Sequence, residues 1–579
     1  MANFLDKMKI NTAVTDHVKL DLSSDHITTA NFMQFNVAWS KELVPGEKIS
    51  VNMETFTRLA PMPVPTFGRA RINNRAFFVP FRTIFPGWND FITDTKHTFS
   101  NGTSATINYA PTIEGKVFWQ FFFTPGIAFV SEEVTDPDAL YDYMDSDGKK
   151  IKLLPKGRQF MKVLNSLGYT PIFINKEDTN KYSALPLLAY AKVYSDWYYP
   201  SAYADDSTSQ EVNALFNRDD VNDFTLTIDH LILIMMVSEK VCYDSDYFVS
   251  AWQNPTTPNN GSYSSFSISD ISTSTGGDSV YTASTNGTPI TTSNSALSQY
   301  ALNALRSLTD YMKRHQLVGA RALDRYLSRF GIQLSAEKLR RSVYIGTTSS
   351  DIQFGDIMST SDTSGAALGD YAGKGIGYGT SNFDFETDEY GIMIIVSSIL
   401  PKTGYYQGVD RNVLHTAKTD YWTPEFDNLG TQAIAAGELF VPAGSSDDSW
   451  NEVDNRSLYN SVFGWTPRYA EYKVGRDRLT GDFRYDTMNA LSDSWHTMRQ
   501  ISYSKAANIK VNSNFVKGAD SGQYSRIFYN TDPDVGDKFN VIYHFDVASY
   551  SPMKALFDTY EFEEKGKEVT LNANGVKMN

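Results

Sequence analysis

Alternation of apolar and polar residues near both ends of the chain is the feature that most constrains its fold. From Phe539 to Val547 every second residue is large and apolar, and the segment from Phe35 to Trp39 has the same period. A period of two places successive side chains on opposite faces, so each segment is predicted to be a strand with one buried face. Strands near both ends of a 579-residue chain, with long material between them, are typical of a sandwich whose first and last strands meet.

Other segments also carry strand patterns. Residues from Phe224 to Ile228 alternate in the same way, which predicts a third strand with one buried face. Denser apolar runs lie at residues 76–79, 117–123 and 392–396, and we expect these to be strands buried on both faces. Aromatic residues make up 14% of the chain, and such rings favour strands and subunit interfaces. The chain is therefore predicted to be β-rich and to assemble.

Three segments show helical periodicity instead. In residues 296–314 apolar side chains recur every three or four positions, and a second helix is predicted for residues 320–330. A third helix is predicted for residues 187–197, closed by Pro200. We therefore expect a helical excursion over residues 296–346.

Two stretches have compositions that do not suit a core. Residues 254–295 are dominated by Ser, Thr, Asn and Gly, and their only charged residues are Asp270 and Asp278. A flexible linker is one interpretation. Apolar residues among the serines favour an ordered or partly ordered excursion, so we expect a surface insertion over residues 201–295. The second stretch, residues 361–380, is rich in glycine and is predicted to be a mobile loop.

Charge and cysteine content narrow the class of protein. The net charge is −15 at pH 7, which excludes a surface that follows nucleic acid over its whole extent, so any DNA contact must be local. A single cysteine, Cys242, rules out an intramolecular disulfide and fits folding in a reducing cytoplasm. The first residues lack the apolar core of a signal peptide, and the longest apolar run, residues 231–237, is too short to span a bilayer. We expect neither export nor membrane insertion.

The sequence carries no complete motif for catalysis or metal binding. No two of its eight histidines have i, i+2 or i, i+4 spacing, and it contains no HExxH and no CxxC. The glycines from Gly373 to Gly379 do not form a nucleotide-binding loop, because Tyr378 and Thr380 stand where the third glycine would fall. Cys242 has no base placed near it by the sequence. We predict no catalytic residue, no metal site and no cofactor.

The best local candidate for contact with a polyanion is a basic segment that includes the two predicted helices. Its arginines would neutralise phosphates and release counterions. The same charges would suit the solvated face of two helices or contacts between subunits. The candidate DNA-contact or subunit-contact residues are Arg306, Arg314, Arg321, Arg325, Arg329, Arg340 and Arg341.

Specific motifs appear in five ordered blocks over roughly residues 40–500, and none of them is catalytic. The blocks include Leu43-Val44-Pro45-Gly46-Glu47, Arg58-Leu59-Ala60-Pro61-Met62, Pro65-Thr66-Phe67-Gly68-Arg69 and Phe77-Phe78-Val79-Pro80-Phe81-Arg82; Leu185-Pro186 and Asp196-Trp197; Gly319-Ala320-Arg321, Arg329-Phe330-Gly331 and Tyr344-Ile345-Gly346; Gly391 and Tyr406-Gln407-Gly408; and Phe463-Gly464, Arg468-Tyr469-Ala470-Glu471-Tyr472 and Trp495-His496. In their order and spacing they resemble the major capsid protein of the Microviridae, the small icosahedral phages with circular single-stranded DNA. The similarity is greatest to the gokushovirus-like members and their relatives from gut bacteria.

This resemblance implies one jelly-roll domain over residues 1–579: a mainly β, eight-stranded antiparallel coat fold with long inserted loops and a few helices. It further implies a structural, non-enzymatic subunit that assembles with itself into a T=1 icosahedral shell in the bacterial cytoplasm and resides in the virion. The expected partners are single-stranded DNA on the inner face, other virion or scaffolding proteins, and a host receptor. The excursion at residues 254–295 is the candidate host contact.

Two rival functions are compatible with the composition. A glycan-binding or glycan-cleaving all-β protein would also be rich in Tyr, Trp and Asp, but a hydrolase needs two carboxylates at a defined separation, which sequence spacing does not show. A phage spike or attachment protein is the other alternative. The lack of a secretion signal counts against the glycan protein, and the five ordered coat-like blocks argue against the spike protein.

Overall fold

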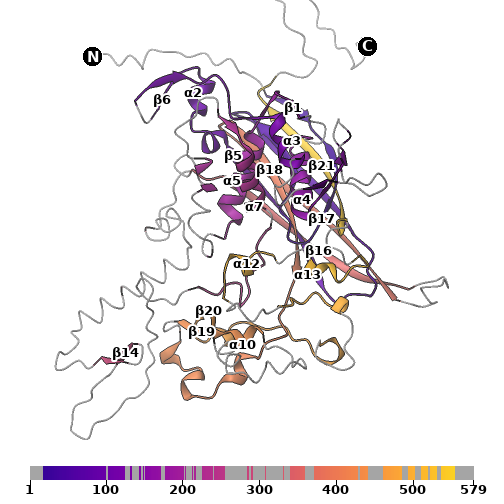
Figure 1. The fold of residues 1–579 in the computed structure, drawn as a ribbon, viewed down its shortest axis with the longest axis vertical. Helices are drawn as coiled ribbons and strands as arrows, with labels where there is room; N and C mark the ends of the chain where they lie inside the picture. Colours follow the sequence, from indigo (N-terminus) through magenta and orange to yellow (C-terminus); the bar gives the residue numbers. More distant parts are fainter. Residues whose placement is uncertain are drawn as a thin grey trace, which may run out of the picture.

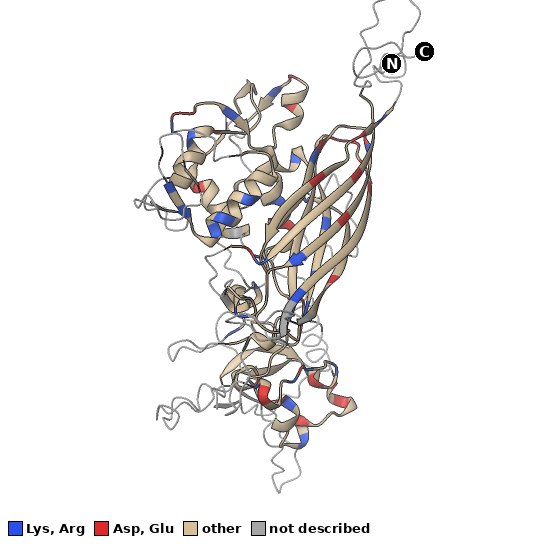
Figure 2. Ribbon diagram, turned by 90° about the vertical axis from the view of Figure 1, so that its right-hand side faces the viewer, with Lys and Arg blue, Asp and Glu red and all other residues tan. Residues whose placement is uncertain are grey.

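A large curled antiparallel sheet dominates the computed structural model (Figure 1). The structure describes residues 17–553, apart from gaps of fewer than ten residues and the longer stretches 254–282, 291–306, 308–329, 359–370 and 441–460. Helices cover one side of the sheet, and a smaller group of short elements lies beyond one end of its strands (Figures 1 and 2). The chain is therefore mainly β, as the sequence predicts.

Nine strands of the described chain are hydrogen-bonded into this sheet. They are β1 (Val18–Asp21), β2 (Ser24–Ala30), β3 (Asn36–Leu43), β4 (Lys48–Leu59), β5 (Arg69–Pro80), β16 (Val343–Met358), β17 (Tyr371–Glu386), β18 (Gly391–Lys402) and β21 (Phe539–Ser551). Their order across the sheet is β1, β21, β4, β17, β16, β5, β18, β3, and β2 also pairs with β21. Because β1 and β2 pair with successive parts of β21, they form one interrupted edge, and the described strands fill eight positions.

The pairing is nested from the ends of the chain inwards. Strand β2 pairs with β21, β3 with β18, β4 with β17 and β5 with β16, all antiparallel. Such nesting arises when one long hairpin folds over on itself, and it is the arrangement of a jelly roll. The two edges of the sheet also approach each other, since Nδ1 of His26 on β2 lies 2.8 Å from the carbonyl oxygen of Ala38 on β3. The predicted jelly-roll coat fold, in which the first and last strands meet, is confirmed.

The core lies between the inward faces of this curled sheet. Strand β21 alternates buried and exposed residues along its length, and Phe539 and Val547 at the two ends of the predicted pattern are buried. Strand β4 alternates in the same way. The runs at residues 76–79 and 392–396 lie in β5 and β18 and are buried throughout, as predicted.

The segment between β5 and β16 forms the helical layer. Its described elements are α1 (Phe81–Ile84), α2 (Trp88–Ile92), β6 (Lys96–Thr98), β7 (Ser104–Thr106), β8 (Thr112–Glu114), α3 (Gly115–Phe123), β9 (Ser131–Glu133), β10 (Tyr143–Met144), β11 (Lys150–Leu153), α4 (Pro155–Ser166), β12 (Lys181–Ser183), α5 (Leu185–Val193), the π-helical turn η3 (Tyr194–Tyr198), β13 (Thr225–Leu226), α7 (Ile228–Ser238), β14 (Ala283–Thr285) and β15 (Thr288–Ile290). Helix α4 packs on β3, and α5 packs on β5 and β18. The helical layer therefore covers the outer face of the half of the sheet that contains β3, β18 and β5.

Two strand predictions in this segment are wrong. Residues 117–123 form most of α3, whose Phe118, Phe121 and Phe122 are buried at helical spacing. An apolar run without alternation does not distinguish a buried helix from a buried strand. In the alternating segment from Phe224 to Ile228, only Thr225 and Leu226 are in a strand, because α7 begins at Ile228. The helix predicted for residues 187–197 is confirmed by α5 and η3.

The prediction of a mobile loop over residues 361–380 is wrong for its second half. Residues 371–380 belong to β17, which pairs with both β16 and β4. Residues 361–370 lie outside the described chain, as do residues 254–282, most of residues 201–223 and the helices predicted for residues 296–314 and 320–330, apart from isolated positions. The predictions for these segments stay predictions.

The second insertion, between β18 and β21, consists of short elements. They are η4 (Arg411–Leu414), η5 (Lys418–Asp420), η6 (Pro424–Phe426), β19 (Thr431–Ala435), α10 (Ala436–Leu439), β20 (Val462–Pro467), η8 (Ala470–Tyr472), η9 (Gly481–Phe483), η10 (Asp493–Trp495), α12 (Ser513–Val516) and α13 (Gly522–Ser525). Strands β19 and β20 pair with each other. This insertion forms the group beyond the lower end of the strands in Figure 1.

Candidate nucleic-acid and subunit-contact surfaces

Of the predicted basic segment from Arg306 to Arg341, the structure describes mainly the last residues. Five of its seven candidate residues lie outside the described chain: Arg306, Arg314, Arg321, Arg325 and Arg329. Arg340 is exposed. The guanidinium of Arg341 lies 3.8 Å from the centroid of the Trp197 ring and donates to the carbonyl oxygen of Asp196 at 2.9 Å. Arg341 therefore helps to fix the entry to β16 within the subunit.

Asp196, whose carbonyl oxygen accepts from Arg341, also binds the chain through its carboxylate. The carboxylate of Asp196 accepts hydrogen bonds from the backbone N–H of Ser342 at 2.8 Å and from its hydroxyl at 2.9 Å. Lys192, one helical turn earlier, lies 3.2 Å from the same carboxylate. Both charged groups are buried, and a buried charge needs such partners. The Asp196-Trp197 motif thus joins the helical layer to Ser342, the residue just before β16.

Gly408, in the Tyr406-Gln407-Gly408 motif, packs closely against another part of the second insertion. A Cβ atom built on Gly408 would lie 1.9 Å from the carbonyl oxygen of Glu438, so the close approach requires glycine. The fully buried Glu438 carboxylate accepts from Arg411 at 2.7 Å and from the Tyr247 hydroxyl at 3.2 Å. Tyr247 belongs to the first insertion, so this site links the two insertions.

Arg499 forms a second link between the insertions. Its guanidinium lies 4.4 Å from the ring centroid of Tyr243 and 4.1 Å from that of Phe515. It also donates to the carbonyl oxygen of Phe515 at 2.7 Å and to the Tyr405 hydroxyl at 3.2 Å. Burial would lower the pKa of Arg499, but the neighbouring Tyr243 and Tyr405 hydroxyls outweigh it and raise that pKa. The cation is thus held permanently charged between aromatic rings.

The described residues offer little that resembles an enzyme site. They contain no group of three or more His, Cys, Asp or Glu side chains able to hold a metal ion. Burial raises the pKa of Cys242 to about 11, so its thiol stays protonated at neutral pH and is a poor nucleophile. No helix of the described chain is long and apolar enough to cross a membrane.

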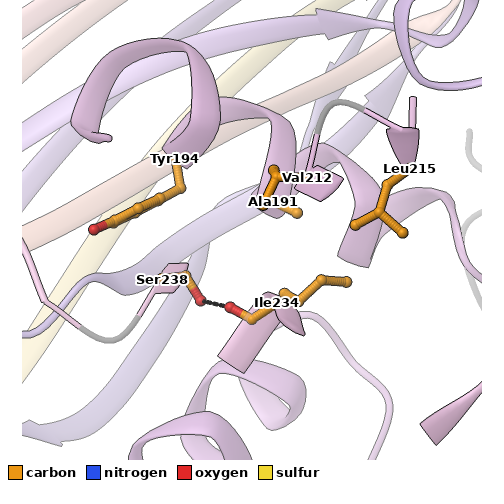
Figure 3. Close-up of a pocket in the computed structure, with 6 residues that line it drawn as sticks. All are labelled: Ala191, Tyr194, Val212, Leu215, Ile234 and Ser238. Carbon is orange, nitrogen blue, oxygen red and sulfur yellow. Dashed lines mark hydrogen bonds between the residues drawn. The ribbon is translucent and has the colours of Figure 1, made fainter. Parts of the chain in front are cut away.

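A small cavity lies inside the helical layer, between α5 and α7 (Figure 3). Its free volume of about 10 Å³ holds at most one water molecule. Its lining residues are Ala191, Tyr194, Val212, Leu215, Ile234 and Ser238. The Ser238 hydroxyl donates to the carbonyl oxygen of Ile234 and so does not face a ligand (Figure 3). This cavity is a packing defect of the layer.

The other half of the sheet exposes its outward side chains. The residues of β18 are buried on both faces, whereas every second residue of β21 and β4 is exposed or half-buried. We call the outward side of β2, β21, β4 and β17, with the adjoining outward residues of β16, β5 and β18, the open face (Figure 2). Cross-strand registers arrange its side chains in three rows.

The first two rows of the open face differ in character. The apolar row consists of directly opposed Ile27, Ile542, Phe56 and Tyr378. Ile27 and Tyr378 are 77% and 59% exposed. The acidic row lies two residues further along each strand. In it His544 stands directly between Asp25 and Glu54. The hydrogen bond that His544 makes to the Asp25 carboxylate raises the pKa of His544, and Glu54 and Asp546 add to that shift.

The third row, on the opposite side of the apolar row, is basic. Its directly opposed members, all exposed, are Asn540, Arg58, Ile376, Gln353, Arg69 and Lys402, on β21, β4, β17, β16, β5 and β18. Two more exposed cations adjoin it: Lys374, two residues before Ile376, and Arg71, two residues after Arg69. We call these five cations, Arg58, Arg69, Arg71, Lys374 and Lys402, the basic row.

Sequence reasoning missed the basic row. Its members are single polar positions in strands that are up to 344 residues apart, and only the strand registers bring them together. One local signal was available, because Phe67, Arg69 and Arg71 alternate with small or apolar residues. That pattern places an aromatic ring and two guanidinium groups on one side of an extended segment.

A nested jelly roll with two long insertions is an architecture of viral coat proteins, which lectins and cupins also use. The chain belongs to the capsid protein (F protein) family, whose sequence model matches residues 8–115 and 154–559. It is 22% identical over 555 residues to the capsid protein VP1 of Chlamydia phage 1, covering 84% of this chain and 87% of that protein. It is 23% identical over 610 residues to the capsid protein VP1 of Bdellovibrio phage phiMH2K, covering 94% of this chain and 98% of that protein. The resemblance to major capsid proteins of the Microviridae is confirmed, and the chain is a structural component of a virion.

Proposed function

We propose that this chain is the major coat subunit of a T=1 icosahedral shell that encloses a circular single-stranded DNA phage genome. The observation that carries the proposal is the nested jelly roll together with a family match over residues 8–115 and 154–559. Assembly takes place in the bacterial cytoplasm, with other virion or scaffolding proteins as partners. A closed shell needs each subunit to present matching surfaces to its neighbours around rotation axes.

Exposed apolar side chains support contacts between copies. In the second insertion Val413, Tyr421, Trp422 and Tyr472 are 74%, 55%, 48% and 50% exposed. Large aromatic groups are enriched at the buried centres of protein interfaces. These four residues are therefore proposed to be covered by neighbouring subunits in the shell.

Two further contacts extend the proposal. The arginines from Arg306 to Arg341 contact either the genome or a neighbouring subunit, because a basic segment in an acidic chain suits both. The near-neutral stretch of residues 254–295 protrudes and meets a host receptor, which is supported by its polarity and by its position between the coat-like blocks. Deleting residues 254–295 should abolish adsorption to host cells while particles still form; unchanged adsorption would exclude the host-contact role.

Negative-stain electron microscopy and analytical ultracentrifugation of the purified protein test the shell directly. The expected result is a uniform icosahedral particle of about 60 copies, which for a 65.0 kDa chain corresponds to about 3.9 MDa. Substituting Trp422 and Tyr421 with Ser should shift the protein towards free subunits, whereas Tyr109→Ser in the helical layer serves as an exposed aromatic control. A monomer that persists at all concentrations and cleaves or binds glycans would overturn the proposal.

A further inference from the structure

The open face carries a local concentration of positive charge in a strongly acidic protein. The whole chain has a net charge of −15, yet the basic row places five cations on neighbouring strands. The described residues directly opposite these cations include one carboxylate, Asp351, which lies 3.6 Å from Arg71. Solvated faces usually mix both signs, so this arrangement favours a polyanionic partner.

Exposed or half-buried aromatic rings flank the basic row on two sides. Tyr378 and Phe56 stand in the adjoining apolar row, and the guanidinium of Arg58 lies 5.1 Å from the Phe56 ring centroid. At the other end Phe67 is 66% exposed and stacks on Trp495, with ring centroids 6.1 Å apart. Cations that follow a backbone, beside rings on which bases stack, are the elements of a site for single-stranded nucleic acid.

The dimensions and surroundings of the row also fit a strand of nucleic acid. Four strand spacings separate Arg58 from Lys402, or about 19 Å along the sheet, which is within the span of a few nucleotides. The acidic row, with Asp25 and Glu54, lies beyond the apolar row and would repel phosphates. A polyanion is therefore confined to one end of the open face.

We propose that the basic row, with Phe67 and Tyr378, is a binding site for single-stranded DNA that does not depend on base sequence. The inference rests on the proposed function, since a coat subunit must contact its genome, and it assigns that contact to the open face of the jelly roll. The cations neutralise phosphates and release counterions, while the two exposed rings stack on bases. In the shell this assignment turns the open face towards the genome and the helical layer away from it.

Fluorescence anisotropy of a labelled 20-nucleotide oligothymidylate with the full-length protein tests the site. The variant Arg58→Gln/Arg69→Gln/Lys402→Gln should bind at least tenfold more weakly at 0.1 M salt. The slope of log Kd against log salt concentration should fall by about 2, because each single-strand phosphate contact contributes about 0.7. The matched control is Lys19→Gln/Lys48→Gln/Lys96→Gln, which removes three exposed lysines away from the basic row and should leave the slope unchanged.

Two single variants distinguish a loss of the binding site from a loss of the fold. Asp351→Asn frees Arg71 and should strengthen binding by about twofold, a gain that a damaged fold would not give. Tyr378→Thr should weaken binding about fivefold with an unchanged salt slope, because a stacked ring contributes no charge. If the basic-row variant and the lysine control bind alike, the site is excluded.

Particle formation by the same variants separates this inference from the proposed function. Variants that bind DNA normally but no longer form particles would show that the basic row meets the acidic row of a second copy, which overturns the DNA site. Variants that lose DNA binding but still form empty shells would support it. If the unaltered protein forms no particles at all, the proposed function fails, whatever the oligonucleotide shows.

Discussion

At the scale of single residues, the largely buried ion pair between Lys162 and Asp537 joins the helical layer to the sheet. Lys162 lies on α4, and its ammonium is 2.8 Å from the Asp537 carboxylate, just before β21. It also donates to the carbonyl oxygen of Thr29 at 3.2 Å and to the Gln34 side chain at 3.1 Å. Asn31 donates to the other carboxylate oxygen at 2.9 Å. A buried charge with so many partners depends on each of them.

Replacing Lys162 with Met should destabilise the protein by about 3–5 kcal/mol, because Asp537 would remain buried without its counterion. Thermal and urea unfolding of the unassembled subunit measure this loss. Lys152→Met, on the exposed side of β11, is the control and should change stability by less than about 0.5 kcal/mol. An equal effect of the two substitutions would show that the ion pair does not matter.

The same pair has a defined pH dependence. Burial would raise the pKa of Asp537, but the Lys162 ammonium and the hydrogen bonds outweigh it and hold that pKa below its ordinary value. The stabilisation is therefore fully present above about pH 4 and is lost as the pH falls through the folded-state pKa. The difference in stability between the unaltered protein and Lys162→Met should accordingly shrink below pH 4.

At the scale of elements, β17 explains why one prediction failed. Its glycines occupy every second position from Gly373 to Gly379, which is a strand period, but glycine carries no apolar side chain to reveal it. The described members of the set, including Gly375 and Gly377, point inwards, where a Cβ on Gly377 would lie 2.9 Å from Cγ1 of Ile352. Larger residues on β4 and β16 fill that space, so glycine here marks close packing rather than mobility.

Gly377→Val should destabilise the subunit by about 1–3 kcal/mol, although valine favours strands, because the added methyl groups overpack against Ile352. Thr380→Val, on the outward side of the same strand, should be neutral within about 0.5 kcal/mol. Both values come from urea unfolding followed by circular dichroism. A stabilised Gly377→Val variant would mean that β17 has room on its inner face.

The sequence predicts elements well where one face differs clearly from the other. Phe539 to Val547 has two such faces, and its prediction is confirmed. The helix predicted for residues 187–197 is also confirmed, although α5 is buried on nearly all sides. The run at residues 117–123 is apolar at almost every position, so its sequence does not show which residues form the buried face of α3, and the strand prediction was wrong. The basic row escaped prediction for a different reason: Arg58 and Lys402 become neighbours of Arg69 only through pairing across the whole sheet.

At the scale of the whole molecule, the nested topology makes the first strands, β1 and β2, pair with the last strand, β21. Strand β21 lies between the β1–β2 edge and β4, so its inward residues, including Val541 and Phe545, close the core between the earliest strands. More than 500 residues separate β2 from β21. Contacts between such distant segments form late, because the loop-closure entropy must be overcome first. Folding of the jelly roll therefore cannot finish before β21 is synthesised.

A chain that ends at residue 535 should consequently fail to form a soluble subunit, since β2 and β4 would each present an unpaired edge and β4 an uncovered apolar face. A synthetic peptide of residues 536–553, added during refolding, should restore soluble protein, because β21 contributes its contacts as a separate strand. The control peptide carries Val541→Asp and Phe545→Asp, which place charges on the buried side and should not restore solubility. Solubility, protease resistance and particle formation are the measurements. Shells built by the shortened chain alone would contradict the requirement for β21, and with it the view that the first and last strands close one core.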